Sequence, residues 1–314
     1  MTEDLVLPVP DELPAMYLVP VSMPDGHAQR IAAAAVARRV AEPLRGLTRR
    51  LIGTPALVVA LRPLAAFSSL PPEQIAADGI APSADSEFVA FAAMSAPRPG
   101  PVHEWITRAA AAAFAADLDL PIVDAFTRRV LNADDALATL PGATRLTDVD
   151  GGFRLADWVM VQQAEQCLTT KGLGRFGLPE LKADDVPLEL HPAWTVALTG
   201  LGHRVLELLR CELRRDSQAP FVQVPAQIDI TRTDVGAAYG LELLEGGRTL
   251  PVRLNLDPAI TDAQDSYLSV DAPDNQPTAA HRLSVQATLF SEPAPASGKR
   301  VRSGAASTPA RTRR

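Results

Sequence analysis

The segment LTTKGLGRFGLPELKADDVP, residues 168–187, is the most distinctive stretch of this 314-residue chain. It places three glycines, a phenylalanine, a Pro-Glu pair and two adjacent aspartates within one turn-rich segment. Gly172, Gly174 and Gly177 also have the spacing G-x-G-x-x-G, which cradles a nucleotide phosphate when a strand precedes it and a helix follows it. The residues around the glycines therefore decide between a cofactor loop and a structural loop.

Those neighbouring residues favour a structural loop. A dinucleotide-binding fingerprint needs an apolar strand before the first glycine and a helix that opens at the third. Here the approach, residues 167–171, is only partly apolar, and Pro179 interrupts the exit. A kinase-type loop would need a lysine on the next strand, and residues 186–190 contain none. We therefore predict a compact turn in which glycines supply positive φ angles and Phe176 plugs the loop.

A binding role for this loop is compatible with the same residues, because function often lies on a loop that a rigid frame holds. Its charged side chains would then form a polar patch. The candidate binding residues are Lys171, Gly172, Gly174, Arg175, Phe176, Gly177 and Glu180.

The stretch TTKGLGRFGLPEL, residues 169–181, resembles a segment of uncharacterised bacterial cytosolic proteins of the domain-of-unknown-function kind. In that segment a T-x-G-L-x-x-F-G-x-P-E-L element precedes a helix. The similarity covers residues 158–209, about a sixth of the chain. It implies no activity, but it implies that the following residues form one structural unit: Thr170, Gly172, Phe176, Gly177, Pro179 and Glu180.

Apolar periodicity in the rest of the chain predicts both helices and strands. Three main helices are expected over residues 27–52, 102–118 and 192–215, and Pro43 should kink or split the first. Strands are expected over residues 16–19, 57–61, 87–94, 122–130, 158–163, 166–170, 221–231, 251–256, 267–270 and 282–290. Strands and helices do not alternate strictly, which favours an α+β fold with mixed, largely antiparallel sheets over a doubly wound one.

A polar, turn-rich seam at residues 131–152 divides the chain. We predict an N-terminal α+β half over residues 1–150 and a C-terminal α+β half over residues 151–290. Two related halves would fit this order of elements, although no sequence repeat aligns.

The formal net charge of −7 is unevenly distributed. Residues 291–314 hold six basic residues against one acidic residue, a net charge of +5, which leaves −12 for residues 1–290. This last segment has too few apolar side chains to offset the entropy of ordering, so we predict a disordered basic tail. It either touches nucleic acid or simply solubilises the chain, and its lack of aromatic side chains that stack on bases favours the second interpretation.

A second basic feature lies on the first predicted helix, where Arg38, Arg45 and Arg49 fall on one side. As a partner surface, this basic stripe would attract an acidic protein or a phosphate backbone. The alternative, which we favour, is the solvated face of an amphipathic helix.

Motifs for metal binding and nucleophilic catalysis are not found in the sequence. The five histidines are scattered singly, so we predict no metal and no cofactor, although the fold could still assemble ligands from distant residues. No G-x-S-x-G elbow is present. Asp124 ends an apolar run, a place where α/β enzymes often carry a carboxylate, but a cap or turn role is favoured.

The longest apolar runs, residues 31–37 and 109–116, are shorter than the roughly 18 to 20 residues that cross a bilayer. The acidic, proline-interrupted start does not have the pattern of a secretory signal. We therefore predict a cytoplasmic protein with no membrane partner.

These observations lead to a functional hypothesis and two alternatives. The leading hypothesis is a non-enzymatic protein that binds another macromolecule, and we expect this partner to be a protein. It follows from the lack of a catalytic motif beside the patterned helices and the distinctive loop. The first alternative is an enzyme on a phosphorylated or nucleotide substrate that uses the loop from Gly172 to Gly177. The second is nucleic-acid association through the basic tail and the arginine-rich helix.

Overall fold

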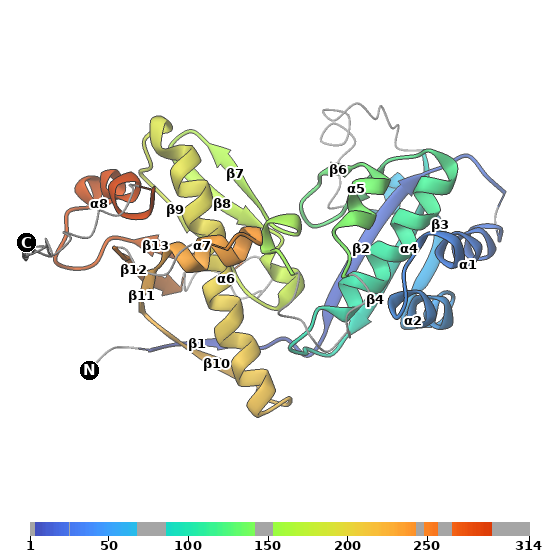
Figure 1. Cartoon of the computed structure of the whole chain (residues 1–314), viewed down its shortest axis with the longest axis horizontal. Coiled ribbons are helices and arrows are strands. Elements are labelled where there is room, and N and C mark those ends of the chain that lie inside the picture. The colour runs from blue at the N-terminus through green and yellow to red at the C-terminus, as the bar shows by residue number, and fades with distance from the viewer. Residues whose placement is uncertain are drawn as a thin grey trace, which may run out of the picture.

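Two α+β units lie side by side in the computed structural model of the chain (Figure 1). The structure describes residues 4–24, 26–67, 86–141, 153–242, 248–256 and 266–290. The predicted α+β class is confirmed, because three sheets with mostly antiparallel pairing are combined with helices. The predicted tail, residues 291–314, lies outside the described residues.

The N-terminal unit is built on a five-stranded antiparallel sheet with the order β3-β4-β2-β5-β6. Its strands are β2 (Leu13–Pro20), β3 (Val58–Pro63), β4 (Glu87–Ser95), β5 (Ile122–Asp124) and β6 (Val130–Leu131). The alternate residues Tyr17 and Phe91 point into the main core, while Leu18 and Ala90 form a smaller cluster on the opposite face. This period-two division between the two faces is what strand geometry imposes on an apolar sequence.

Helices pack on the core face of this sheet. They are α1 (Ala28–Arg39), α2 (Leu44–Leu51), α4 (Val102–Leu118) and α5 (Ala133–Ala138). The predicted split at Pro43 is confirmed, because α1 ends before this residue and α2 begins after it. Helix α4 is central: its alanines let other elements approach closely, and Phe114 packs on Phe91 with ring centroids 5.4 Å apart.

The C-terminal unit contains a six-stranded sheet with the order β11-β12-β13-β9-β8-β7. Its strands are β7 (Met160–Ala164), β8 (Cys167–Lys171), β9 (Glu180–Ala183), β11 (Gln227–Ile230), β12 (Leu250–Leu256) and β13 (Tyr267–Asp271). The helices of this unit are α6 (His191–Arg215), α7 (Arg232–Tyr239) and α8 (Thr278–Val285). Strands β9 and β13 are parallel, so the two units differ in strand order and in pairing.

The chain crosses between the units near its start. Strand β1 (Asp4–Pro8) pairs with β10 (Phe221–Pro225) beside the C-terminal unit, and the chain then continues into β2 of the N-terminal unit (Figure 1). The inner side of this two-stranded ribbon is apolar, with Leu7 and Val224 fully buried. Residues 4–8 therefore pair with a strand that lies more than 200 positions later in the sequence.

Two predicted strands have a different structure. Residues 122–130 form the hairpin β5-β6 instead of one strand, because the Asp124 carboxylate accepts the backbone N–H of Phe126 and Arg128 adopts φ 59°. Residues 282–290 are helical, since Val285 and Leu289 are buried at a spacing of four, which is a helical and not a strand period.

The predicted strand over residues 221–231 is in fact two strands in different sheets. Strand β10 pairs with β1, whereas β11 pairs with β12 after a break at Ala226. The short elements β1, β9, α5 and α7 were not predicted, because each is too short to show a clear apolar period. Within the described residues, no helix is both long enough and apolar enough to cross a bilayer.

Candidate functional site

The glycine loop links β8 to β9 through the 3-10 helix η4 (Leu173–Phe176) and is organised around the carboxylate of Glu180. Its Oε1 accepts the backbone N–H groups of Gly172 and Leu173 at 2.7 and 2.9 Å. Its Oε2 accepts the hydroxyl of Thr170 at 2.7 Å. Consecutive N–H groups of this kind form a concave anion-binding nest. In this chain the anion in the nest is the protein's own Glu180.

The glycines of the loop have different structural roles. Gly172 and Gly177 adopt φ 109° and 80°, as predicted, because this backbone conformation is unfavourable for residues with a Cβ atom. A Cβ at Gly172 would also lie 2.6 Å from the carbonyl oxygen of Trp158. A Cβ at Gly174 would meet nothing within 4 Å. Only two of the three glycines in the G-x-G-x-x-G pattern are therefore required by the backbone.

Arg175 connects the loop to the N-terminal unit through its side chain. Its side chain is fully buried, and its Nη1 donates to the hydroxyl of Tyr17 at 3.1 Å and approaches Oε2 of Glu104 at 3.4 Å. Its Nη2 donates to Oδ1 of Asp124. The partners come from β2, α4 and β5, so one loop side chain joins three elements of the other unit.

A second buried arginine, Arg108 of α4, completes this ionic cluster. Its Nε donates to the hydroxyl of Tyr17 at 3.1 Å, and its Nη2 lies 3.9 Å from Oδ2 of Asp124. Its guanidinium also stacks on Trp158, 3.4 Å from the ring centroid. Tyr17 in turn donates to Glu104 at 2.7 Å, so its hydroxyl uses one donor and two acceptor positions.

The buried cluster is charge-balanced, with two guanidinium groups and two carboxylates. Burial raises the pKa of Tyr17 well above its usual value, which keeps its hydroxyl protonated. Burial opposes the charge on Arg175, but Asp124 and Glu104 outweigh this effect and raise the pKa of Arg175. Each charge is compensated by a neighbour in the interior, as buried ions require. The arrangement is suited to holding two units together.

Acid should weaken this cluster through Asp124. Burial alone would raise the pKa of its carboxyl group, but Arg175 and Arg108 together lower it below the usual value. The unfolded chain therefore binds this proton at a higher pH than the folded chain, and the stabilisation is present above a pH of about 4 and lost below it. Below that pH, the free energy of unfolding of the Asp124→Asn variant should fall less steeply with decreasing pH than that of the wild type. Urea unfolding at several pH values measures both slopes. Equal slopes for the variant and the wild type would contradict this assignment.

The predicted loop residues do not form one exposed patch. Lys171 lies on the sheet and donates to the hydroxyl of Tyr267 at 3.2 Å, away from the ionic cluster. Glu180 is 8% exposed, and Arg175 is completely covered. Phe176 plugs the loop as predicted, since it is buried and its ring meets Phe153 edge to face. The polar patch expected from the sequence is thus absent from this loop, and a ligand-binding role for it stays a prediction.

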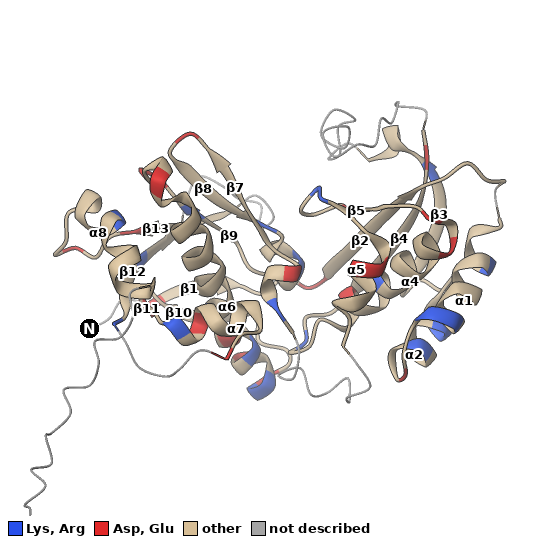
Figure 2. Ribbon diagram, turned by 45° about the horizontal axis from the view of Figure 1, so that its top comes forward, with Lys and Arg blue, Asp and Glu red and all other residues tan. Residues whose placement is uncertain are grey.

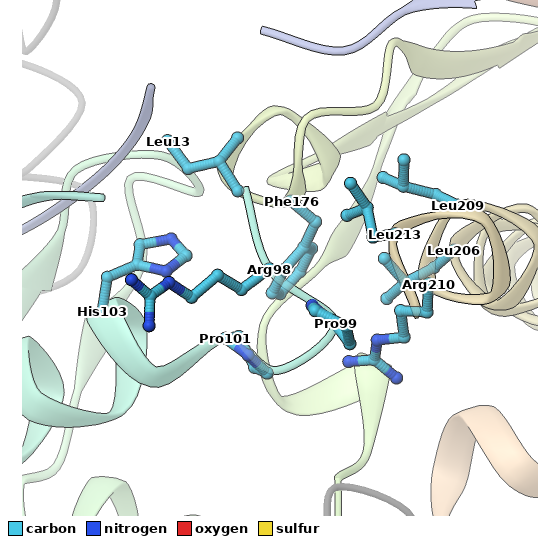
Figure 3. Close-up of a pocket in the computed structure, with 10 residues that line it drawn as sticks. All are labelled: Leu13, Arg98, Pro99, Pro101, His103, Phe176, Leu206, Leu209, Arg210 and Leu213. Atoms are coloured by element: carbon cyan, nitrogen blue, oxygen red, sulfur yellow. The ribbon is translucent and has the colours of Figure 1, made fainter. Parts of the chain in front are cut away.

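A small pocket adjoins the loop where the two units meet (Figure 3). His103 and Pro101 line it on one side, Leu206 and Leu213 of α6 line it on the other, and Phe176 lies between them. Its volume of about 10 Å³ has room for roughly one water molecule. This pocket is therefore too small for a substrate.

Basic residues lie on both α1 and α2 (Figure 2). Of the three candidate residues of the basic stripe, Arg38 belongs to α1, and Arg45 and Arg49 belong to α2. Arg38 is paired with Asp117 of α4, and Arg45 donates to Glu42 at 2.9 Å. Arg49 is exposed near the end of α2. Acidic neighbours thus neutralise part of the stripe, as on an ordinary solvated helix face.

The sequence alone did not identify Tyr17, Glu104 and Arg108 as members of a cluster. One signal was present for Tyr17, because a tyrosine in the middle of an apolar strand needs a partner for its hydroxyl. Glu104 and Arg108 are four residues apart, so they share one face of α4, but the same spacing is common on exposed helices. Asp124 has the predicted turn role and is an ionic partner as well.

The outer face of the N-terminal sheet carries exposed apolar side chains. Val58, Ala92 and Met16 form one row across three strands, according to the strand registers. Met94 follows on the same face, and it is 49% exposed, compared with 44% for Val58. The neighbouring row through Leu18 and Ala90 is buried, so apolar surface continues from this packed row to the exposed side chains of Val58 and Met94.

Among the residues that the structure describes, no group of three His, Cys, Asp or Glu side chains has a geometry that could hold a metal ion. Comparisons of the chain with protein-family models, with curated proteins and with solved structures find no match. Function is therefore inferred from the geometry of the chain itself.

Proposed function

We propose that this chain acts by binding another protein, through the outer face of the sheet β3-β4-β2-β5-β6, and not by catalysis. The observation that carries the proposal is the apolar row of Val58, Ala92 and Met16, which Met94 extends. Val58 and Met94 are exposed, whereas Ala92 and Met16 are partly buried. Contiguous exposed apolar surface on a folded protein marks an interaction site. A partner with a complementary apolar surface would bury these side chains.

The charged residues support a binding role over a catalytic one. The two carboxylates of the ionic cluster, Glu104 and Asp124, are almost completely buried and pair with Arg108 and Arg175. A catalytic acid or base has to reach a substrate within hydrogen-bond distance. This cluster therefore contributes to the frame of the molecule, and the sheet face is the better candidate for a binding surface.

The two alternatives have less support. A phosphate at the glycine loop would have to displace the buried carboxylate of Glu180 from the amides of Gly172 and Leu173. A nucleic acid on α1 and α2 would compete with Asp117 and Glu42 for Arg38 and Arg45. The tail itself, residues 291–314, lies outside the described residues.

The sheet face can be tested by placing a charge on it. We expect Met94→Lys to abolish the capture of the partner from a lysate of the native organism, because a lysine there would have to be desolvated in the complex. Leu188→Lys is the matched control, since Leu188 is 67% exposed but belongs to the C-terminal unit. Both variants should keep the free energy of unfolding within about 0.5 kcal/mol of the wild type.

The outcomes separate clearly. A protein retained by the wild type and by Leu188→Lys, but lost by Met94→Lys, supports the proposal. A wild-type dimer that becomes monomeric in Met94→Lys, measured by light scattering, identifies the partner as a second copy of the chain. Capture that is equal for all three proteins, together with an unchanged molar mass, would overturn the assignment of this face.

A further inference from the structure

A second pocket opens at the junction of the two units, next to the buried ionic cluster but outside it. Its volume is about 280 Å³, close to the lower end of pockets that hold small molecules. Residues of α4, the β5-β6 hairpin and α5 line it from one unit, and Ala156 and Asp157 line it from the other. Ligand sites occur preferentially at such junctions. The polar lining residues are Arg108, Arg129, Asn132, Asp135, Thr139 and Asp157.

The positive charge in this pocket comes from two arginines. Arg108 is 1% exposed and is held rigidly, because its Nη1 donates to Thr139 at 2.9 Å and its Nη2 donates to the Asp157 carbonyl at 3.1 Å. These bonds leave further N–H groups on both terminal nitrogens, since a guanidinium has five in all. Arg129 is half-buried, and its side chain makes no ion pair or hydrogen bond with any residue that the structure describes.

The negative charge comes mainly from Asp157, which is half-buried. Its carboxylate makes no hydrogen bond within the described part of the chain. Burial raises its pKa, although Arg154, Arg108 and Arg129 act in the opposite direction. A cationic or donor group that enters the pocket can therefore approach this carboxylate and offset the cost of its partial burial. Asp135 adds a second, exposed carboxylate at the rim.

Both signs of charge therefore line one small pocket, together with the apolar residues Val130, Leu131, Ala136 and Ala156. A simple anion would satisfy the arginines but would be repelled by Asp157, and a simple cation would have the opposite mismatch. We propose that the pocket binds a free α-amino acid, whose carboxylate lies on Arg129 and Arg108 and whose ammonium lies on Asp157. The apolar lining residues then accept its side chain.

The test uses the full-length chain and the twenty L-amino acids, each added singly at millimolar concentration. A ligand that binds only the folded state raises the unfolding midpoint. We expect at least one amino acid to raise the midpoint by a few degrees, and acetate or ethylamine at the same concentration to leave it unchanged. Arg129→Gln and Asp157→Asn should each remove the rise while leaving the ligand-free midpoint close to the wild type.

Arg62→Gln is the matched control, because β3 lies at the opposite edge of the sheet from β6, and this variant should keep the full rise. The proposal is overturned if no amino acid raises the midpoint of the wild type. It is also overturned if acetate or ethylamine has the same effect, or if the rise persists in both Arg129→Gln and Asp157→Asn. Isothermal titration of the wild type with the most effective amino acid measures the binding directly, and heats equal to those of dilution would likewise overturn the proposal.

Discussion

Replacing Arg175 by methionine is expected to lower the free energy of unfolding by about 3 to 5 kcal/mol, measured by urea denaturation at neutral pH. The guanidinium is fully buried and is the principal cation for both Asp124 and Glu104. Methionine keeps the apolar stem of the side chain and removes the guanidinium, so the loss reflects mainly the two uncompensated carboxylates. Arg108 does not compensate for the missing guanidinium, because its Nη2 lies 3.9 Å from Oδ2 of Asp124, beyond hydrogen-bond distance.

Arg38→Met provides the comparison for a surface ion pair. Arg38 pairs with Asp117 but its side chain is 60% exposed, so its removal should cost no more than about 1 kcal/mol. Without Arg175, the carboxylates of Asp124 and Glu104 are buried charges that lack their main cation. Neutralising both should restore part of the free energy of unfolding, so we expect the triple variant Arg175→Met, Asp124→Asn, Glu104→Gln to be more stable than Arg175→Met alone. If Arg175→Met were no more destabilising than Arg38→Met, the buried cluster would not connect the two units.

Gly172→Ala should destabilise the chain by about 3 kcal/mol, whereas Gly174→Ala should be neutral or slightly stabilising. The first substitution forces a Cβ into a backbone with φ 109° and to within 2.6 Å of the Trp158 carbonyl oxygen. The second adds a methyl group to open space outside the left-handed region. Thermal and urea unfolding of the two variants measure the difference directly.

This pair of variants separates a structural loop from a phosphate loop. In a phosphate-binding G-x-G-x-x-G element, the second glycine is needed so that the backbone can approach the ligand closely. In this chain the anion is Glu180 of β9, which accepts the amides of Gly172 and Leu173 and, at 3.4 Å, that of Gly174. A Cβ at Gly174 would still meet nothing within 4 Å. Equal destabilisation by both variants would contradict this account of the loop.

Local patterns predicted much of the fold. Helix α4 has the bounds expected from its apolar periodicity, and α6 begins within one residue of its expected start. The break at Pro43 followed from the loss of a backbone donor and from the clash of the proline ring with the preceding turn. Such features depend on residues within a few positions of one another. The predicted strand over residues 282–290 was wrong because its buried positions, Val285 and Leu289, have a helical spacing that alternate apolar residues concealed.

The candidate sites depend on contacts that local patterns do not contain. Arg175 is 158 positions from Tyr17 and 51 from Asp124, and an arginine is usually a surface residue. The pocket that holds Arg129 and Asp157 is likewise assembled from both units. The row of Val58, Ala92 and Met16 on the sheet face can be recognised only from the strand registers.

The sequence by itself determined the class of fold, the main helices and the turn at Gly172 and Gly177, because backbone sterics and apolar periodicity act over short separations. Only the tertiary structure decided where the charges lie. A carboxylate or guanidinium is stable in the interior only when neighbouring groups compensate its charge or its hydrogen bonds, and the partners of Arg175 come from distant segments. The glycine loop consequently carries its own anion, Glu180, and its arginine joins the two units.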